Sequence, residues 1–240
     1  MYTLYWFYYL LGIVMIPGIA LGVWAEIKVF SAFKEYNKVE TKHGKEAKDV
    51  ARFILDGAGC VETKIKTVNG ELTDNYNPKT NTVSLSQSVY NQKTISAIGV
   101  TAHEIGHVLQ HRDKYTPIKV RNALVPVINF SGYLMWPLII IGFILEFAYA
   151  TTAADILIYL GIGIYGLNTI FCLITLPIEI NASKRAEKML LATAELDEEV
   201  IKGVKKVLKA AAWTYVAALV TSILSLLRLL LFVFALRNRD

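Results

Sequence analysis

The chain has 240 residues, of which 54% are hydrophobic and 19% are charged, and its mean hydropathy is +0.42. These values exclude an ordinary soluble domain and indicate long apolar segments that alternate with a polar region. The net charge of +5 is modest, and because cytoplasmic loops of membrane proteins collect Lys and Arg, we expect no nucleic-acid partner.

Four apolar segments are long enough to cross a lipid bilayer as helices, and they span residues 5–24, 124–149, 156–176 and 211–236. About 20 residues at 1.5 Å each match the ~30 Å thickness of the hydrocarbon core. A cleaved signal peptide is the alternative for the first segment. It is disfavoured because no basic residue precedes the apolar stretch and no small-residue cleavage site follows it. Pro137 predicts a kink in the second segment, and Arg228 in the fourth is better explained by a partner in the bundle or by snorkelling than by a function.

The distribution of Lys and Arg predicts the orientation in the membrane. Both long polar segments are rich in basic residues, whereas the link between the second and third spans has none. Because positively charged loops stay inside, we expect both polar segments in the cytoplasm and both termini outside, although Arg237 and Arg239 mildly oppose this. The predicted organisation is a transmembrane helix (1–24), a cytoplasmic α+β segment (25–122), two transmembrane helices (123–176), a cytoplasmic helix (177–210) and a last transmembrane helix with the tail (211–240).

The first polar segment contains patterns for both helices and strands. Residues 45–56 predict an amphipathic helix that ends at Gly57, and Asn69-Gly70 predicts the turn of a β-hairpin between residues 61–68 and 71–76. Residues 82–85 predict a further short strand. Residues 94–111 predict a helix with an apolar stripe. The fold class that we expect is therefore a mainly α membrane protein with about four transmembrane helices and a small α+β domain.

A metal-binding pattern lies on the last of these predicted helices. His103 and His107 are four residues apart, so their side chains project from one face about 6 Å apart along the axis and can share one zinc ion. Glu104 is placed to take a proton from a water that zinc activates. Three such fixed positions arise by chance in a sequence this size on the order of once in a hundred. The alternative is two surface histidines without a metal.

A catalytic zinc site needs a third protein ligand, and Glu179 is the best candidate. Pro177 favours the first turn of a new helix, which with four spans emerges on the side of the histidine helix. The alternative for Glu179 is a helix-start carboxylate that the helix dipole stabilises. His111 lies about 12 Å from His103 along a straight helix, and a solvent-facing histidine at the helix end is its better interpretation.

Residues near these candidates predict supporting roles. Ser183 shares the helical face of Glu179 and is a candidate hydrogen-bond partner that supports the metal ligands. Asn181 and Arg185 are candidates for contacting the substrate or stabilising the oxyanion, with a salt bridge or a lipid headgroup as the alternative for Arg185. Gly106 costs a helix interior about 1 kcal/mol relative to Ala, so we expect close packing or substrate access at this position.

Three stretches together resemble the YugP-like neutral zinc metallopeptidases of bacterial membranes. They are the Tyr-Asn-Pro turn with residues 85–90, the histidine helix at 101–111, and residues 176–183. That family is in turn similar to the HtpX and CAAX-type membrane endopeptidases. The resemblance implies a zincin-like domain with Zn²⁺ held by His103, His107 and Glu179, and with Glu104 as general base. Ser183 stands where the HtpX type has an acidic residue.

The resemblance also bears on the substrate. In the wider clan an edge strand before the histidine helix binds the substrate as an added strand, which here implies Thr82, Val83, Ser84 and Leu85. We therefore expect a zinc metalloendopeptidase of the cell membrane that cleaves membrane-associated or nearby polypeptides, with its active site facing the cytoplasm. The alternatives are a zinc-dependent transporter or channel, disfavoured because the spans lack acidic and His residues apart from Glu146 and Asp155 near one surface, and an inactive scaffold, disfavoured by the intact Glu104.

Overall fold

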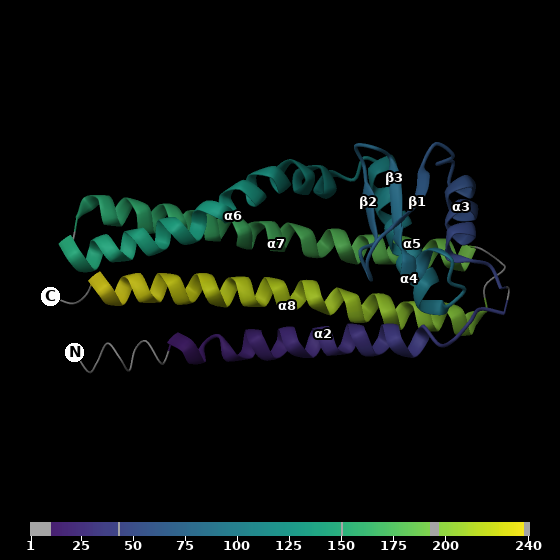
Figure 1. Ribbon diagram of the computed structural model, residues 1–240, viewed down its shortest axis with the longest axis horizontal. Helices are drawn as coiled ribbons and strands as arrows, with labels where there is room; N and C mark the ends of the chain where they lie inside the picture. Colours follow the sequence, from purple (N-terminus) through teal and green to yellow (C-terminus); the bar gives the residue numbers. More distant parts are fainter. Residues whose placement is uncertain (1–10, 43, 150, 193–196, 238–240) are drawn as a thin grey trace. The chain divides into compact units, whose positions relative to one another are not determined.

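The computed structural model describes residues 11–42, 44–149, 151–192 and 197–237, so that residues 5–10 of the first predicted span and the end of the tail lie outside the described residues. The chain divides into two compact units (Figure 1). Unit 1 comprises Met1–Trp24, Val120–Leu176 and Tyr215–Asp240, and unit 2 comprises Ala25–Lys119 and Pro177–Thr214.

Four described helices are long and apolar enough to cross a membrane: α2 (Ile16–Tyr36), α6 (Thr116–Tyr149), α7 (Thr152–Ala192) and α8 (Glu198–Arg237). This confirms the prediction of a mainly α, multi-pass membrane protein. Large apolar side chains such as Ile144 and Phe234 are more than half exposed on these helices, as expected for side chains that face lipid.

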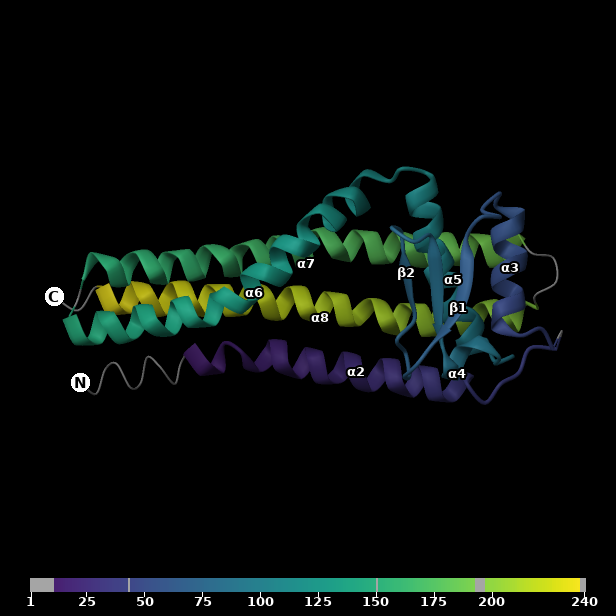
Figure 2. The ribbon, with the colours of Figure 1, turned by 45° about the horizontal axis from the view of Figure 1, so that its top comes forward.

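The helices of unit 1 run side by side in both views (Figures 1 and 2). A Cβ atom at Gly161 of α7 would lie 2.3 Å from the Ile139 side chain of α6, so the absence of a side chain allows close contact. The hydroxyls of Thr169 and Ser222 share a hydrogen bond of 2.8 Å between α7 and α8. Arg228 of α8 lines a small cavity of about 340 Å³ within this unit.

The expectation that a new helix begins at Pro177 is wrong. The α7 helix continues through this proline to Ala192, and α6 likewise contains Pro126 and Pro137 without interruption. Proline removes only its own N–H from the ladder, and neighbouring helices support a membrane helix at such a point. Glu179 consequently lies on the same continuous helix as the third apolar segment.

Unit 2 contains a three-stranded sheet with the order β1-β3-β2. The strands are β1 (Lys64–Val68), β2 (Asn75–Asn77) and β3 (Thr82–Ser86), and the short helix α4 (Gln87–Tyr90) follows β3 directly. β3 pairs with β1 in parallel and with β2 antiparallel. The predicted hairpin between the first two strands is therefore wrong, because β3 lies between them.

The expectation that residues 82–85 form a substrate-binding edge strand is also wrong. Thr82–Ser86 pairs along its whole length with β1, and Thr82, Val83 and Ser84 pair with β2 on the other side. All five residues of β3 are buried. A central strand has no free backbone groups for an added strand, so Thr82, Val83, Ser84 and Leu85 are residues of the core.

Two further helices pack with the sheet in unit 2, α3 (Ala47–Gly57) and α5 (Ile95–Arg112). Thr94 caps α5, since its side chain accepts a hydrogen bond from the Ala97 amide at 3.4 Å. The predicted histidine helix is confirmed. Buried side chains from α3, β3, α5, α7 and α8 share one core, among them Leu55, Leu85, Ile98, Ile105, Leu190 and Val204. This core holds α5 against the parts of α7 and α8 that belong to unit 2.

Candidate metal centre

Helices α5 and α7 lie in very close contact at Gly106. A Cβ atom there would lie 2.4 Å from the carbonyl oxygen of Ala182, which is far shorter than any normal contact. The close packing expected for this glycine is therefore confirmed. It brings the face of α5 that carries His103 and His107 against the face of α7 that carries Glu179.

Three side chains converge at this helix contact. Oε2 of Glu179 lies 3.1 Å from Nε2 of His103 and 3.4 Å from Nε2 of His107. One ligand atom from each of the three residues lies within 4.8 Å of the others. Two imidazole nitrogens and one carboxylate oxygen are the donors found in catalytic zinc sites, so this group fits a zinc ion and leaves a position open.

The Nδ1 atoms of both histidines bond to other side chains. Nδ1 of His103 lies 3.2 Å from the Ser183 hydroxyl, and Nδ1 of His107 lies 3.0 Å from Oε1 of Gln110. Ser183 thus contacts a histidine of the group. The sequence analysis did not identify Gln110 as a partner of His107. Its position three residues after His107, on the same helix face, could have indicated this contact. These contacts direct Nε2 of each ring towards Glu179.

Burial and neighbouring charges shift the pKa values of Glu179, His107 and Glu104. Burial alone would raise the pKa of Glu179, but hydrogen bonds with His103 and His107 outweigh it and hold the pKa well below its usual range. Burial lowers the pKa of His107, and the hydrogen bond and charge of Glu179 more than reverse this. Burial raises the pKa of the Glu104 carboxyl, and the neighbouring histidines oppose that shift. Two buried carboxylates beside two imidazoles form a place where a cation is stabilised.

The remaining candidate residues lie around this group. Oδ1 of Asn181 accepts hydrogen bonds from Gln110 at 3.0 Å and from Nε of Arg185 at 2.8 Å. Arg185 also pairs with Asp113 at the end of α5. His111 is exposed outside the group, and its ring faces that of Tyr76 at 6.1 Å between centroids.

Known proteins resemble this chain over most of its length. A family model described as "Putative neutral zinc metallopeptidase" matches residues 11–234. The curated "Putative membrane protease YugP" of Bacillus subtilis (strain 168) is 41% identical over 213 residues, which cover 89% of this chain and 92% of that protein. No solved structure matches the chain. The extent of the match shows that the chain belongs to this neutral zinc metallopeptidase family.

Proposed function

We propose that this protein is a membrane-embedded zinc metalloendopeptidase in which His103, His107 and Glu179 hold the zinc ion and Glu104 is the general base. The observation that carries the proposal is the convergence of three ligand atoms from α5 and α7 within 4.8 Å. The Glu179 carboxylate is 3% exposed, and a carboxylate so deeply buried needs a positive partner.

Peptide hydrolysis requires separate chemical roles, which we assign to the zinc ion and to Glu104. A bound zinc ion would polarise the scissile carbonyl and lower the pKa of a water molecule. Glu104 directly follows His103 on α5 and is 8% exposed, so bulk water scarcely competes for its carboxylate. Burial raises its pKa, which makes the carboxylate a better proton acceptor near neutral pH. We assign it the transfer of the proton from the water to the leaving amine.

We propose that the substrate binds at the edge of the sheet nearest to α5. In the described part of the sheet, β2 is the outer strand on this side, and its Tyr76 contacts His111 one turn beyond His107. An extended polypeptide can pair with such an open edge and so lie along the histidine helix. We propose β2, in place of residues 82–85, as the strand that orients a membrane-associated or nearby polypeptide.

The proposed orientation of the site rests on the distribution of basic residues along the chain. Basic residues concentrate in the two segments that form unit 2, which favours the cytoplasmic side of the membrane. A cysteine placed at exposed Lys66 tests this. It should react with a membrane-impermeant reagent in inverted vesicles and stay unlabelled in intact cells. The reverse pattern would refute the orientation.

Replacing Glu104 separates catalysis from metal binding. The purified Glu104→Gln protein should keep its zinc and lose cleavage of an unfolded protein substrate, with the products identified by mass spectrometry. If the variant cleaved at the wild-type rate, Glu104 would not be the general base. A transporter or scaffold would be indicated if the wild type bound zinc, cleaved nothing, and kept its transport or partner binding in the variant.

The ligand set is tested by zinc content. The variants His103→Ala and Glu179→Ala should each lose most of their zinc after dialysis, because removing one of three ligands leaves the ion weakly held. Lys188→Ala, on the same part of α7 but outside the ligand group, is the control and should retain zinc. Full occupancy in Glu179→Ala would overturn the assignment of the third ligand.

A further inference from the structure

A chain of hydrogen bonds runs from His107 to Arg185. Nδ1 of His107 lies 3.0 Å from Oε1 of Gln110, whose Nε2 lies 2.8 Å from the Ile178 carbonyl and 3.0 Å from Oδ1 of Asn181. The same Asn181 oxygen accepts from Nε of Arg185 at 2.8 Å. Gln110 has no exposed surface, so bulk water does not compete for these bonds.

The two ends of the chain determine the direction of every bond in it. The Arg185 guanidinium can only donate, so the Asn181 atom that faces it is the accepting oxygen. The Ile178 carbonyl can only accept, so the Gln110 amide nitrogen faces α7 and its oxygen faces His107. An accepting oxygen requires an N–H at Nδ1 of His107. In the neutral imidazole this leaves the lone pair on Nε2, the atom that faces Glu179.

We infer that Gln110, Asn181 and Arg185 are positioning residues that hold His107 in the tautomer and ring orientation of a metal ligand. The inference rests on the proposed function, and it gives Asn181 and Arg185 a different role from the substrate or oxyanion contacts that the sequence suggested. A histidine that binds a metal through Nε2 depends on the group that accepts its Nδ1–H. Here that group is an amide whose own orientation is determined by two further residues.

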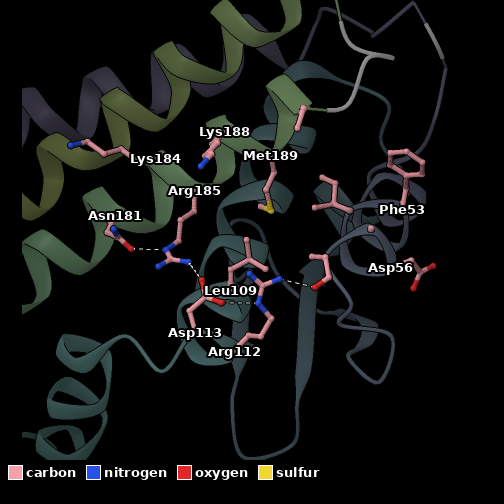
Figure 3. Close-up of a pocket in the computed structure, with 14 residues that line it drawn as sticks. Phe53, Asp56, Leu109, Arg112, Asp113, Asn181, Lys184, Arg185, Lys188 and Met189 are labelled. Atoms are coloured by element: carbon pink, nitrogen blue, oxygen red, sulfur yellow. Dashed lines mark hydrogen bonds and ion pairs between the residues drawn. The ribbon is translucent and has the colours of Figure 1, made fainter.

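Arg185 is itself anchored at its outer end, as Figure 3 shows. Its Nη1 pairs with Asp113, whose other carboxylate oxygen lies 2.7 Å from Nε of Arg112, and Arg112 also donates to the Ala58 carbonyl at 2.6 Å. The hydrogen bonds from Arg112 and Arg185 hold the pKa of Asp113 below its usual range, so this carboxylate stays ionised at neutral pH. Arg185 lines a cavity of about 1070 Å³ and is held at its wall.

Substitutions along the chain test the inference through metal binding. Gln110→Met should weaken zinc binding by about 10- to 100-fold, the range typical for groups that support a metal ligand. Asn181→Leu should weaken it less. Asn181→Asp keeps an acceptor for both donors and should restore near-wild-type affinity. Adding Arg185→Met to Gln110→Met should cause little further loss, because the chain is already broken. Lys184→Met, which lines the same cavity, is the matched control and should change nothing.

The readouts are zinc affinity, measured by competition with a chelating dye, and the visible absorption of the Co²⁺-substituted protein. A change in His107 geometry alters the Co²⁺ bands, whereas a merely structural role would leave them in place. Wild-type affinity and bands in folded Gln110→Met, or equal losses in Asn181→Asp and Asn181→Leu, would overturn the inference alone. A wild type that binds no zinc would overturn the proposed function and this inference with it.

Discussion

The contact at Gly106 makes a sharp prediction, because α5 contains two buried glycines in different surroundings. A Cβ at Gly106 would lie 2.4 Å from the Ala182 carbonyl oxygen and 3.0 Å from its carbonyl carbon, both backbone atoms that cannot rotate away. A Cβ at Gly99 would meet the Val204 side chain at 3.5 Å, an ordinary contact. Gly106→Ala should therefore push α5 and α7 apart, and Gly99→Ala should be accepted in place.

The pair of variants isolates the steric cost. Each replacement gains about 1 kcal/mol in helix propensity, since both positions lie inside α5. Overpacking in a close-packed region costs about 1–3 kcal/mol and occasionally more. We therefore expect Gly99→Ala to be neutral or stabilising, and Gly106→Ala to be less stable than Gly99→Ala by the whole overpacking cost. For a chain of this size each kcal/mol corresponds to about 2–4 °C in Tm.

The measurement is the Tm of each purified variant, together with its zinc affinity. Ala182 lies three residues after Glu179 on α7, so a displaced α7 moves this carboxylate away from the two histidines. A displacement near 1 Å is enough to impair a metal site, and we expect zinc affinity to fall on the order of tenfold or more in Gly106→Ala. Equal Tm values and equal zinc affinities for the two variants would refute the role of this contact.

Three further predictions concern the domain around the site. Thr94→Ala should lower the free energy of unfolding by about 1 kcal/mol through loss of the α5 cap, with Thr94→Ser as the control that keeps it, and a Tm unchanged in Thr94→Ala would contradict this. Burial raises the pKa of Asp74 despite its hydrogen bonds with Ser86, so the folded state binds the proton more tightly than the unfolded chain, and stability should fall as pH rises from about 4. Melting curves of Asp74→Asn should lack that part of the pH dependence, and an unchanged profile would exclude Asp74 as its cause. Removing zinc with a chelator should lower the Tm, and adding zinc should restore it. At a free zinc concentration one hundred times the Kd, binding should raise the free energy of unfolding by about 2.7 kcal/mol. A Tm that does not change with zinc would argue against a metal site in the folded state.

Local patterns were sufficient for the elements that depend on neighbouring residues. The α5 helix combines an apolar stripe with histidines at helical spacing, and both signals lie within twenty residues. The four membrane helices follow from composition and length in the same way. The glycine between the two candidate ligands indicated either close packing or substrate access, because glycine is costly inside a helix, and the contact with Ala182 agrees with close packing.

Strand order could not be read in this way, because it depends on contacts between distant residues. The chain does bend at Asn69-Gly70, and Gly70 has a φ of 106°, but the chain after it crosses to the far side of β3. The parallel pairing of β1 with β3 has no signature in the sequence of either segment alone, so the sequence favoured a local hairpin. Pro177 misled for a related reason: its effect on a helix depends on the neighbours that support the helix around it.

The continuity of α7 through Pro177 changes what the site can act upon. Glu179 is three residues beyond Leu176, the last residue that α7 contributes to unit 1, and three residues span about 5 Å along a helix axis. A loop would let the carboxylate move independently of the membrane segment, whereas an unbroken helix fixes its distance from that segment's end. The proposed third ligand is thus tied to the end of an apolar helix. For the proposed peptidase, this connection favours polypeptides held at or near the membrane as substrates, because its third ligand follows the apolar part of α7 by a single turn of helix.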